Sequence, residues 1–395
     1  MRNPFSTLFM GGFECADHLN CHGEKVNLLQ ETQHDIRAEK DYCSVSEMGI
    51  GVVREGICWS EVERSEGEFD FSEVLNRIRI AETYGIQQIW DLIHFGYPHG
   101  LFPTHPKFCE RFEKLCIAFA QFYKIHVSRE LLVIPINEIS FLSWLSGEVR
   151  GTVPYAVHSG WDIKYHLCKA AIAGIRALKS IMPECRIIIA EPLIKIHNNG
   201  VTDPDEVGRI NDYQYQAMDI IAGRLCPELG GHESFLDILG FNYYWNCQWT
   251  LHSGTLPWPE PEDEKKRDPL YYLLKIAYER YKRPLFISET GHFGIGRIPW
   301  IEEITRECIK AIKNNIPLLG VCVYPVIDRP DWDDLRNYSN CGIFDLDPDC
   351  NRIPNEGYIR AIIHSYQLLI KSKKEMSEAL FSGATGNNDR TVYQR

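Results

Sequence analysis

Long hydrophobic runs are absent from this sequence of 395 residues. It contains no stretch of about 18 apolar residues, the length that a helix needs to cross a bilayer. The N-terminal segment MRNPFSTLFMGGFEC also lacks the continuous apolar core of a secretory signal peptide. We therefore expect a soluble, cytoplasmic protein with no membrane partner.

Basic residues are fewer than acidic residues in this sequence. The chain has 42 Lys and Arg against 54 Asp and Glu, which gives a formal net charge of -12. A negative long-range field repels phosphate groups, so we expect no nucleic-acid partner and no anionic membrane surface. The composition makes no prediction about oligomeric state.

A standard metal-binding motif is missing, although the chain has 14 cysteines. Cys15, His18, Cys21 and His22 lie close together, but their spacing matches no zinc pattern and no second cluster completes a site. Other cysteines lie inside apolar segments such as EKLCIAFA, where reduced thiols behave as small buried hydrophobic groups. We therefore expect rim and loop residues here and no metal.

Short apolar runs alternate with longer amphipathic segments along the chain, a pattern typical of βα units and a parallel sheet. The predicted strands are residues 8–14, 50–59, 87–95, 131–138, 186–192, 237–244, 284–291 and 318–328. The predicted helices are residues 35–48, 72–84, 107–126, 162–181, 205–225, 269–281, 300–314 and 358–371. This alternation predicts an α/β protein with a single (β/α)8 TIM barrel.

The barrel is expected to span residues 1–375. The C-terminal sequence SGATGNNDRTVYQR has no apolar periodicity. We therefore expect residues 376–395 to form a disordered tail.

Two carboxylates close predicted strands, Glu138 after VIPIN and Glu289 after LFIS. The C-terminal ends of barrel strands form one mouth, so both side chains should point into the same site. A lone Glu at a strand end is ordinarily a solvated rim residue. A convergent pair, however, is the equipment of glycoside hydrolysis, with one acid and one nucleophile or base.

Other strand ends carry hydrogen-bonding and aromatic side chains that are typical of a sugar site. These residues are Arg54, His94, Asn242, Tyr243, Tyr244 and Trp332. Glu191 also ends a strand, but it has no adjacent amide side chain, so we expect it to be a rim or structural group.

Several segments, in the right order, resemble motifs of glycoside hydrolase family 1, the β-glucosidase-like retaining glycosidases with a (β/α)8 barrel. REGICWS resembles the family's R-F-S-I-S-W-S, LIHFGYP resembles L-x-H-W-D-L-P, and INE resembles F-N-E-P. DILGFNYY resembles D-F-L-G-I-N-Y-Y, PLFISETG resembles P-I-Y-I-T-E-N-G, and CGIFDLD followed by RIP resembles the closing segment.

The resemblance implies that Glu138 is the acid/base and that Glu289 is the nucleophile. It also implies substrate-binding roles for Arg54, His94, Asn137, Asn242, Tyr244, Asp331 and Trp332. Among these, Arg54 and Tyr244 are expected to keep Glu289 ionised and oriented. No cofactor is expected for this chemistry.

The chain departs from the family pattern on strands three and eight. Phe95 and Gly96 stand where the family has Trp and Asp after the strand-three His. YPVIDRPDW replaces W-S-L-L-D-N-F-E-W, which puts Tyr324, Asp331 and Trp332 at the Trp, Glu and Trp positions. The catalytic pair is therefore kept while the sugar-recognition residues are altered.

Two further departures lie on strands one and four. Ile139 replaces the Pro that follows the acid in the family. The segment FMGGFECADHLN has no clear counterpart of the family's sugar-binding Gln, although Glu14 or His18 could stand in.

These observations favour a retaining glycoside hydrolase that acts on a small-molecule or oligosaccharide glycoside by double displacement. Two alternatives stay open. A transglycosidase would use the same covalent intermediate, and a non-catalytic glycan-binding barrel would have lost the reaction.

Overall fold

A closed barrel of parallel strands forms the centre of the protein, whose computed structural model describes residues 3–261 and 265–385. Around the barrel the strands are β1 (Phe9–Gly12), β2 (Val52–Gly56), β5 (Gln87–Ile93), β6 (Leu132–Ile136), β7 (Arg186–Pro192), β9 (Ile238–Asn242), β12 (Leu285–Thr290) and β13 (Leu318–Val323). β13 pairs with β1 and closes the ring. The predicted (β/α)8 fold is confirmed.

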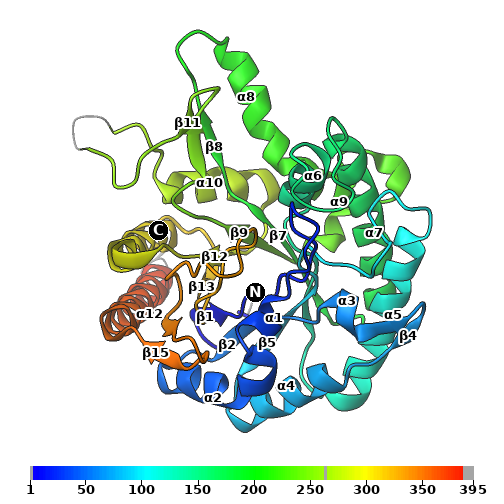
Figure 1. Ribbon diagram of the computed structural model, residues 1–395. Coiled ribbons are helices and arrows are strands. Elements are labelled where there is room, and N and C mark those ends of the chain that lie inside the picture. Colours follow the sequence, from blue (N-terminus) through cyan, green and yellow to red (C-terminus); the bar gives the residue numbers. More distant parts are fainter. Residues whose placement is uncertain (1–2, 262–264, 386–395) are drawn as a thin grey trace, which may run out of the picture.

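Helices surround the barrel (Figure 1). They are α1 (Leu28–Glu31), α2 (His34–Glu47), α3 (Trp59–Val62), α4 (Ser72–Thr83), α5 (Phe108–His126), α6 (Ile139–Gly147), α7 (Gly160–Ile181), α8 (Pro204–Asp212), α9 (Gln216–Ile221), α10 (Leu270–Tyr281), α11 (Arg297–Lys313) and α12 (Glu356–Thr385). Short 3₁₀ turns are η1 (Tyr213–Tyr215), η2 (Pro227–Leu229), η3 (Glu233–Phe235) and η5 (Gly294–Gly296).

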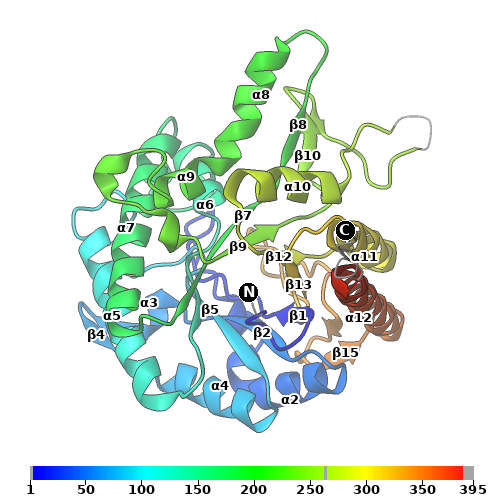
Figure 2. The same cartoon turned by 180° about the vertical axis from the view of Figure 1, so that it is seen from behind.

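Small sheets lie outside the barrel. They are formed by β3 (Glu63–Ser65) with β4 (Glu68–Phe69), by β8 (Lys195–His197) with β10 (Gln248–Thr250) and β11 (Gly254–Thr255), and by β14 (Phe344–Leu346) with β15 (Arg352–Pro354). The sheet of β8, β10 and β11 projects from the barrel together with α8 (Figures 1 and 2).

Alternate side chains of strand β12 belong to two different apolar layers. Phe286 belongs to the cluster inside the barrel, whereas Leu285 and Ile287 pack in the layer between strands and helices. The pairing of β12 with β9 shifts register between Ile287 and Glu289. Such bulges re-aim side chains beside active sites, and this one breaks the alternation just before Glu289.

Two predicted segments differ from the structure. The expected helix at residues 205–225 is divided into α8, η1 and α9. At the C-terminus α12 continues to Thr385, so residues 376–385 are helical and the predicted disordered tail begins too early. Met376 packs against the core and anchors this part of the helix. Residues 386–395 lie outside the described residues.

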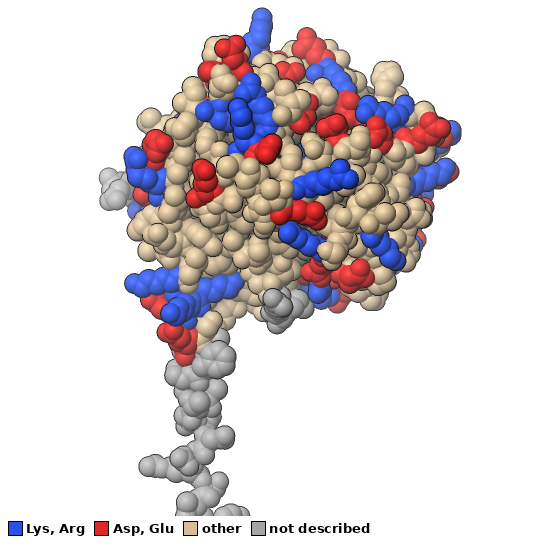
Figure 3. Space-filling view, turned by 90° about the horizontal axis from the view of Figure 1, so that it is seen from below, with Lys and Arg blue, Asp and Glu red and all other residues tan. Residues whose placement is uncertain are grey.

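The surface carries charges of both signs. On the face seen in Figure 3, Lys and Arg side chains are interspersed with Asp and Glu side chains. Among the helices of the described residues, none is both long enough and apolar enough to cross a bilayer.

A buried ionic network joins α2 to the barrel wall. His34 Nδ1 lies 2.8 Å from Asp41 Oδ2, and His34 Nε2 lies 3.0 Å from Glu55 Oε1. Arg77 also pairs with Glu55, and Tyr42 donates a hydrogen bond of 2.6 Å to the same carboxylate. Burial lowers the pKa of His34, but the charges and hydrogen bonds of Glu55 and Asp41 outweigh burial, so the pKa is raised. The imidazolium form therefore stabilises the fold.

We predict that His34→Asn destabilises the protein by about 3 to 5 kcal/mol, as expected for loss of one partner in a buried ionic group. Because the pKa of His34 is raised in the folded state, its contribution is complete below the unfolded value near 6.5 and is lost as pH rises through the folded value. The difference in unfolding free energy between wild type and variant, from urea titrations, should shrink from about pH 6 upward. A pH-independent difference would contradict this, and the exposed His126→Asn serves as control.

Candidate active site

Glu138 lies at the C-terminal end of β6, as predicted. It is the N-cap residue of α6 and has a left-handed backbone (φ 48°), which is uncommon for a non-glycine residue. Its amide donates to the Ala190 carbonyl of β7 over 2.9 Å. The strained turn therefore ties the position of Glu138 to the neighbouring strand.

Glu289 lies near the end of β12 and is 5% exposed. Arg54 Nη1 donates to its Oε1 over 2.7 Å, and the Tyr244 hydroxyl donates to its Oε2 over 2.7 Å. Each carboxylate oxygen therefore receives one short hydrogen bond, and one of the two donors carries a charge. These bonds stabilise and orient the ionised carboxylate.

Arg54 connects Glu289 to the rest of the site. Its Nε and Nη2 donate to Asp91, with the shortest bond at 2.6 Å, and its Nη2 also donates to Asn137 Oδ1 over 2.7 Å. Burial lowers the pKa of Arg54, but Asp91 and Glu289 raise it well above its usual range. A permanent cation thus lies beneath the barrel mouth.

The pKa of Glu138 is raised well above its usual range. Burial is the largest cause, followed by the negative charge of Glu289, while a hydrogen bond from Asn242 and the charge of Arg54 oppose the shift. Glu138 and Glu289 therefore interact in one site, and the raised pKa favours the protonated form of Glu138.

Asp91 was not singled out from the sequence, yet it organises this site. His94 Nδ1 lies 2.8 Å from Asp91 Oδ2, and His94 Nε2 lies 3.4 Å from Glu14 Oε1. Burial lowers the pKa of His94, but Asp91 and Glu14 outweigh burial and raise it. The available signal was a charged residue inside the apolar run IWDLI.

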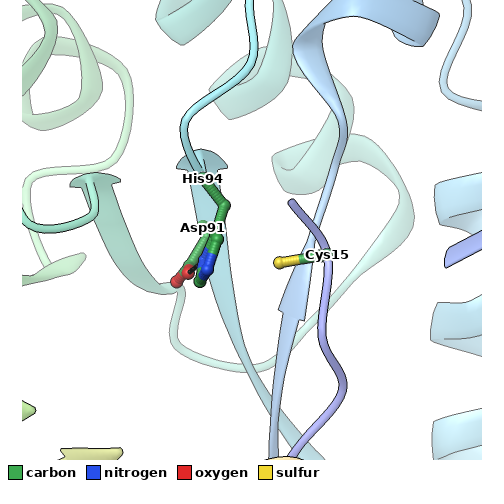
Figure 4. Close-up of side chains that lie close together, drawn as sticks. All are labelled: Cys15, Asp91 and His94. Carbon is green, nitrogen blue, oxygen red and sulfur yellow. Dashed lines mark hydrogen bonds and ion pairs between the residues drawn. The ribbon is translucent and has the colours of Figure 1, made fainter. Parts of the chain in front are cut away.

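Figure 4 shows Cys15, Asp91 and His94, the one group of potential metal ligands that converges among the described residues, with ligand atoms within 4.8 Å of one another. Both oxygens of Asp91 already accept hydrogen bonds from Arg54. The buried, positively charged guanidinium of Arg54 would repel a metal cation bound to Asp91. The hydrogen bonds of Asp91 with Arg54 and His94 explain why these side chains lie together.

The two predicted asparagines meet between the strands. Asn242 Nδ2 donates to Asn137 Oδ1 over 3.3 Å, and Asn242 Oδ1 accepts a 2.6 Å hydrogen bond from Ser288. Asn137 Nδ2 is buried and has no hydrogen-bond partner among the described residues. A buried donor without a partner is available to a ligand hydroxyl.

Trp332 and Asp331 differ in their surroundings although they are neighbours. The half-buried Trp332 ring lies 4.9 Å from the His18 ring and 5.2 Å from the Phe95 ring. Asp331 is exposed, and its Oδ1 accepts the amide of Asp333 over 2.9 Å. The structure thus brings Trp332 beside the strand-three residues and leaves Asp331 on the outer loop, where its sugar contact stays a prediction.

Known proteins are similar to this chain in sequence and in fold. No protein-family model matches the chain. A 6-phospho-beta-glucosidase of Dickeya chrysanthemi is 22% identical over 354 residues, which cover 74% of this chain and 75% of that protein. The family 1 β-glucosidase from Thermotoga maritima superimposes with a TM-score of 0.73 at 15% identity, covering 94% of this chain and 98% of that one. The AHE enzyme from Alicyclobacillus herbarius gives a TM-score of 0.75 at 16% identity, over 93% of this chain and 99% of that one.

This chain is similar in sequence to a 6-phospho-beta-glucosidase and shares the (β/α)8 fold of family 1 β-glucosidases. The sequence resemblance is thereby confirmed, and the solved structures establish the shared fold.

Gly96, which stands where the family 1 motif has Asp, lies against Asp17. A Cβ at Gly96 would collide with the carboxylate and backbone of Asp17. Asp17 is buried, and burial raises its pKa to about 6. The Asp17 carboxylate, from the segment after β1, therefore occupies the space beside Gly96.

We predict that Glu289→Gln lowers the pKa of Glu138. The substitution removes the negative charge of Glu289, which raises the pKa of Glu138, and leaves the opposing positive charge of Arg54. Burial still keeps the pKa of Glu138 above its usual range. Carboxyl ¹³C NMR titration of glutamate-labelled protein measures this, with Glu138→Gln to assign the signal. An unchanged pKa would show that the two carboxylates do not interact. Glu307→Gln, a buried carboxylate paired with Lys310, is the matched control.

Proposed function

We propose that this protein is a retaining glycoside hydrolase that cleaves a soluble β-glycoside by double displacement. The observation that carries the proposal is the asymmetry of two carboxylates in one barrel mouth. Glu138 has a raised pKa, whereas Glu289 accepts short hydrogen bonds from Arg54 and Tyr244. A proton donor and an ionised nucleophile are what retaining hydrolysis requires.

In the first step Glu289 attacks the anomeric carbon with a carboxylate oxygen. The bond from that carbon to the leaving oxygen breaks, and Glu138 gives its proton to the leaving group. The products are a free alcohol or phenol and a sugar esterified to Glu289. Loss of negative charge on Glu289 in this step lowers the pKa of Glu138, so Glu138 stays ionised and can act as the base of the second step.

In the second step Glu138 takes a proton from water as the water oxygen attacks the same carbon. The ester bond to Glu289 breaks, and Glu289 leaves as a carboxylate that Arg54 and Tyr244 again stabilise. Two inversions give a sugar with retained configuration. Glu138 ends the cycle protonated.

The surrounding side chains supply the predicted sugar contacts. Asn137 Nδ2 has an unused hydrogen, and the raised pKa of His94 favours a donor form. Asn242, bonded to Asn137 and Ser288, would hold the asparagine pair in place, and the Trp332 ring would stack on the CH face of the sugar. No cofactor takes part in either step.

The choice of sugar is tested directly with aryl glycosides. The Dickeya relative is named for a phosphorylated glucoside, and Thermotoga β-glucosidase structures contain glucoimidazole and deoxynojirimycin. A panel of aryl β-glucoside, β-galactoside and 6-phospho-β-glucoside, with and without glycerol, should release phenol and initially β-configured sugar by ¹H NMR. Glyceryl glycoside as the main product would indicate a transglycosidase, and binding without turnover would indicate a glycan-binding barrel.

We predict that Glu289→Ala lowers turnover by at least about 10²-fold and that azide or formate restores it on an activated aryl glycoside, with inverted product. The small anion fills the space of the missing carboxylate and attacks once, so configuration inverts. The matched Glu138→Ala variant should keep the first step for leaving groups that need no protonation. Wild-type rates in Glu289→Ala would remove Glu289 from its role.

A further inference from the structure

Strand β7 ends with a buried carboxylate, Glu191, that the proposed mechanism does not use. It is 1% exposed, and its two oxygens lie 3.4 and 3.1 Å from the amide nitrogen of Ser140. The backbone amide of Ile139 also donates toward it. The nearby Lys164 donates to Gln216 over 2.9 Å instead. Glu191 is therefore held by the first amides of α6.

These amides belong to the turn that carries Glu138. The first amides of a helix have no partner within the helix, and the N-cap side chain usually accepts one of them. Glu138 occupies the N-cap position of α6, but its side chain makes no capping hydrogen bond. Glu191 supplies the missing acceptor from a neighbouring strand and places a carboxylate at the positive end of the helix dipole.

Ile139, the residue after Glu138, explains why a hydrogen-bond acceptor is needed at the start of α6. The family motif N-E-P has Pro at this position, which has no amide hydrogen and a fixed φ. Ile139 has an amide that must be satisfied, because it is buried at 1% exposure. In this chain hydrogen bonds from the backbone amides of Ile139 and Ser140 to Glu191 thus take the place of the covalent restraint that Pro provides.

We infer that Glu191 is a positioning residue for Glu138: it fixes the turn at residues 138–140 and so keeps the acid/base carboxyl aimed at the leaving oxygen. The inference rests on the proposed function, since it assigns Glu191 a part in proton donation. It gives a specific task to Glu191, which the sequence predicted to be a rim or structural group.

The charge of Glu191 acts on the same carboxyl. The titratable groups that face it are Glu138 after β6 and Lys164 and Cys168 on α7. Burial raises the pKa of Glu191 to about 7, while the Ser140 amide and Lys164 oppose the shift. After burial and Glu289, Glu191 is a further cause of the raised pKa of Glu138. Removing its charge should therefore lower the pKa of Glu138.

The test compares two leaving groups on one sugar, phenol and 2,4-dinitrophenol. Glu191→Ala should lower kcat/KM for the phenyl glycoside by about 10- to 100-fold, since general acid catalysis is worth about 10² to 10⁴. The dinitrophenyl glycoside, which needs no proton, should lose less than about threefold. Glu191→Gln keeps an acceptor oxygen, so it should restore most of the phenyl activity while the alkaline limb of its pH profile moves to lower pH.

The matched control is Glu148→Ala, because Glu148 Oε1 caps α7 through the Gly160 amide at 2.9 Å. It should change both substrates equally. Equal loss on both substrates in Glu191→Ala, or no loss, would overturn the inference. If wild type hydrolyses neither glycoside, the proposed function fails. Carboxyl NMR titration of Glu138 in Glu191→Gln still decides the positioning contact: a lowered pKa supports it, and an unchanged pKa overturns it.

Discussion

The buried guanidinium of Arg54 is the interaction on which the site depends. A cation removed from water is costly unless anions and hydrogen-bond acceptors surround it. Arg54 donates hydrogen bonds to Asp91 on β5 and to Asn137 after β6. It also donates to Glu289 and to the Ser288 carbonyl on β12. Because these partners come from separate strands, the closed barrel is what brings them together. The same contacts fix the orientation of the proposed nucleophile and of the asparagine beside the acid.

The difference between the two glutamates follows from what surrounds each of them. Glu289 receives donors on both oxygens, whereas the half-buried Glu138 loses part of its hydration and faces the charge of Glu289. Both effects come from residues at strand ends held in the barrel. The backbone of Glu138 is strained, and the contact of Glu191 with the following turn offsets that strain. The proposed roles of the two glutamates therefore depend on where β6, β7 and β12 end.

The barrel and the convergence of Glu138 and Glu289 at its mouth could be predicted because both leave local signals. Each strand is an apolar run bounded by turn residues, and Glu138 and Glu289 interrupt such runs at their ends. Asp91 gave only a weak signal, because its partners Arg54 and His94 become neighbours through strand pairing. The role of Glu191 depends on a contact between two strand ends that no spacing in the sequence reveals.

Loop and terminal details were less predictable for physical reasons. Asp331 occupies the expected motif position, but the loop conformation turns its carboxylate to the Asp333 amide and solvent. The extension of α12 depends on Met376 packing against the core, a tertiary contact that outweighs the weak local pattern.

The central claim is that Glu289, oriented by Arg54, forms a covalent bond to the sugar. Incubation with a 2,4-dinitrophenyl 2-deoxy-2-fluoro-β-glycoside of the preferred sugar, followed by mass spectrometry of peptides, tests it most directly. The fluorine slows the second step, so we predict one fluorosugar attached to the peptide that contains Glu289. A label on another residue, or continued turnover of the reagent with no label on Glu289, would contradict the account.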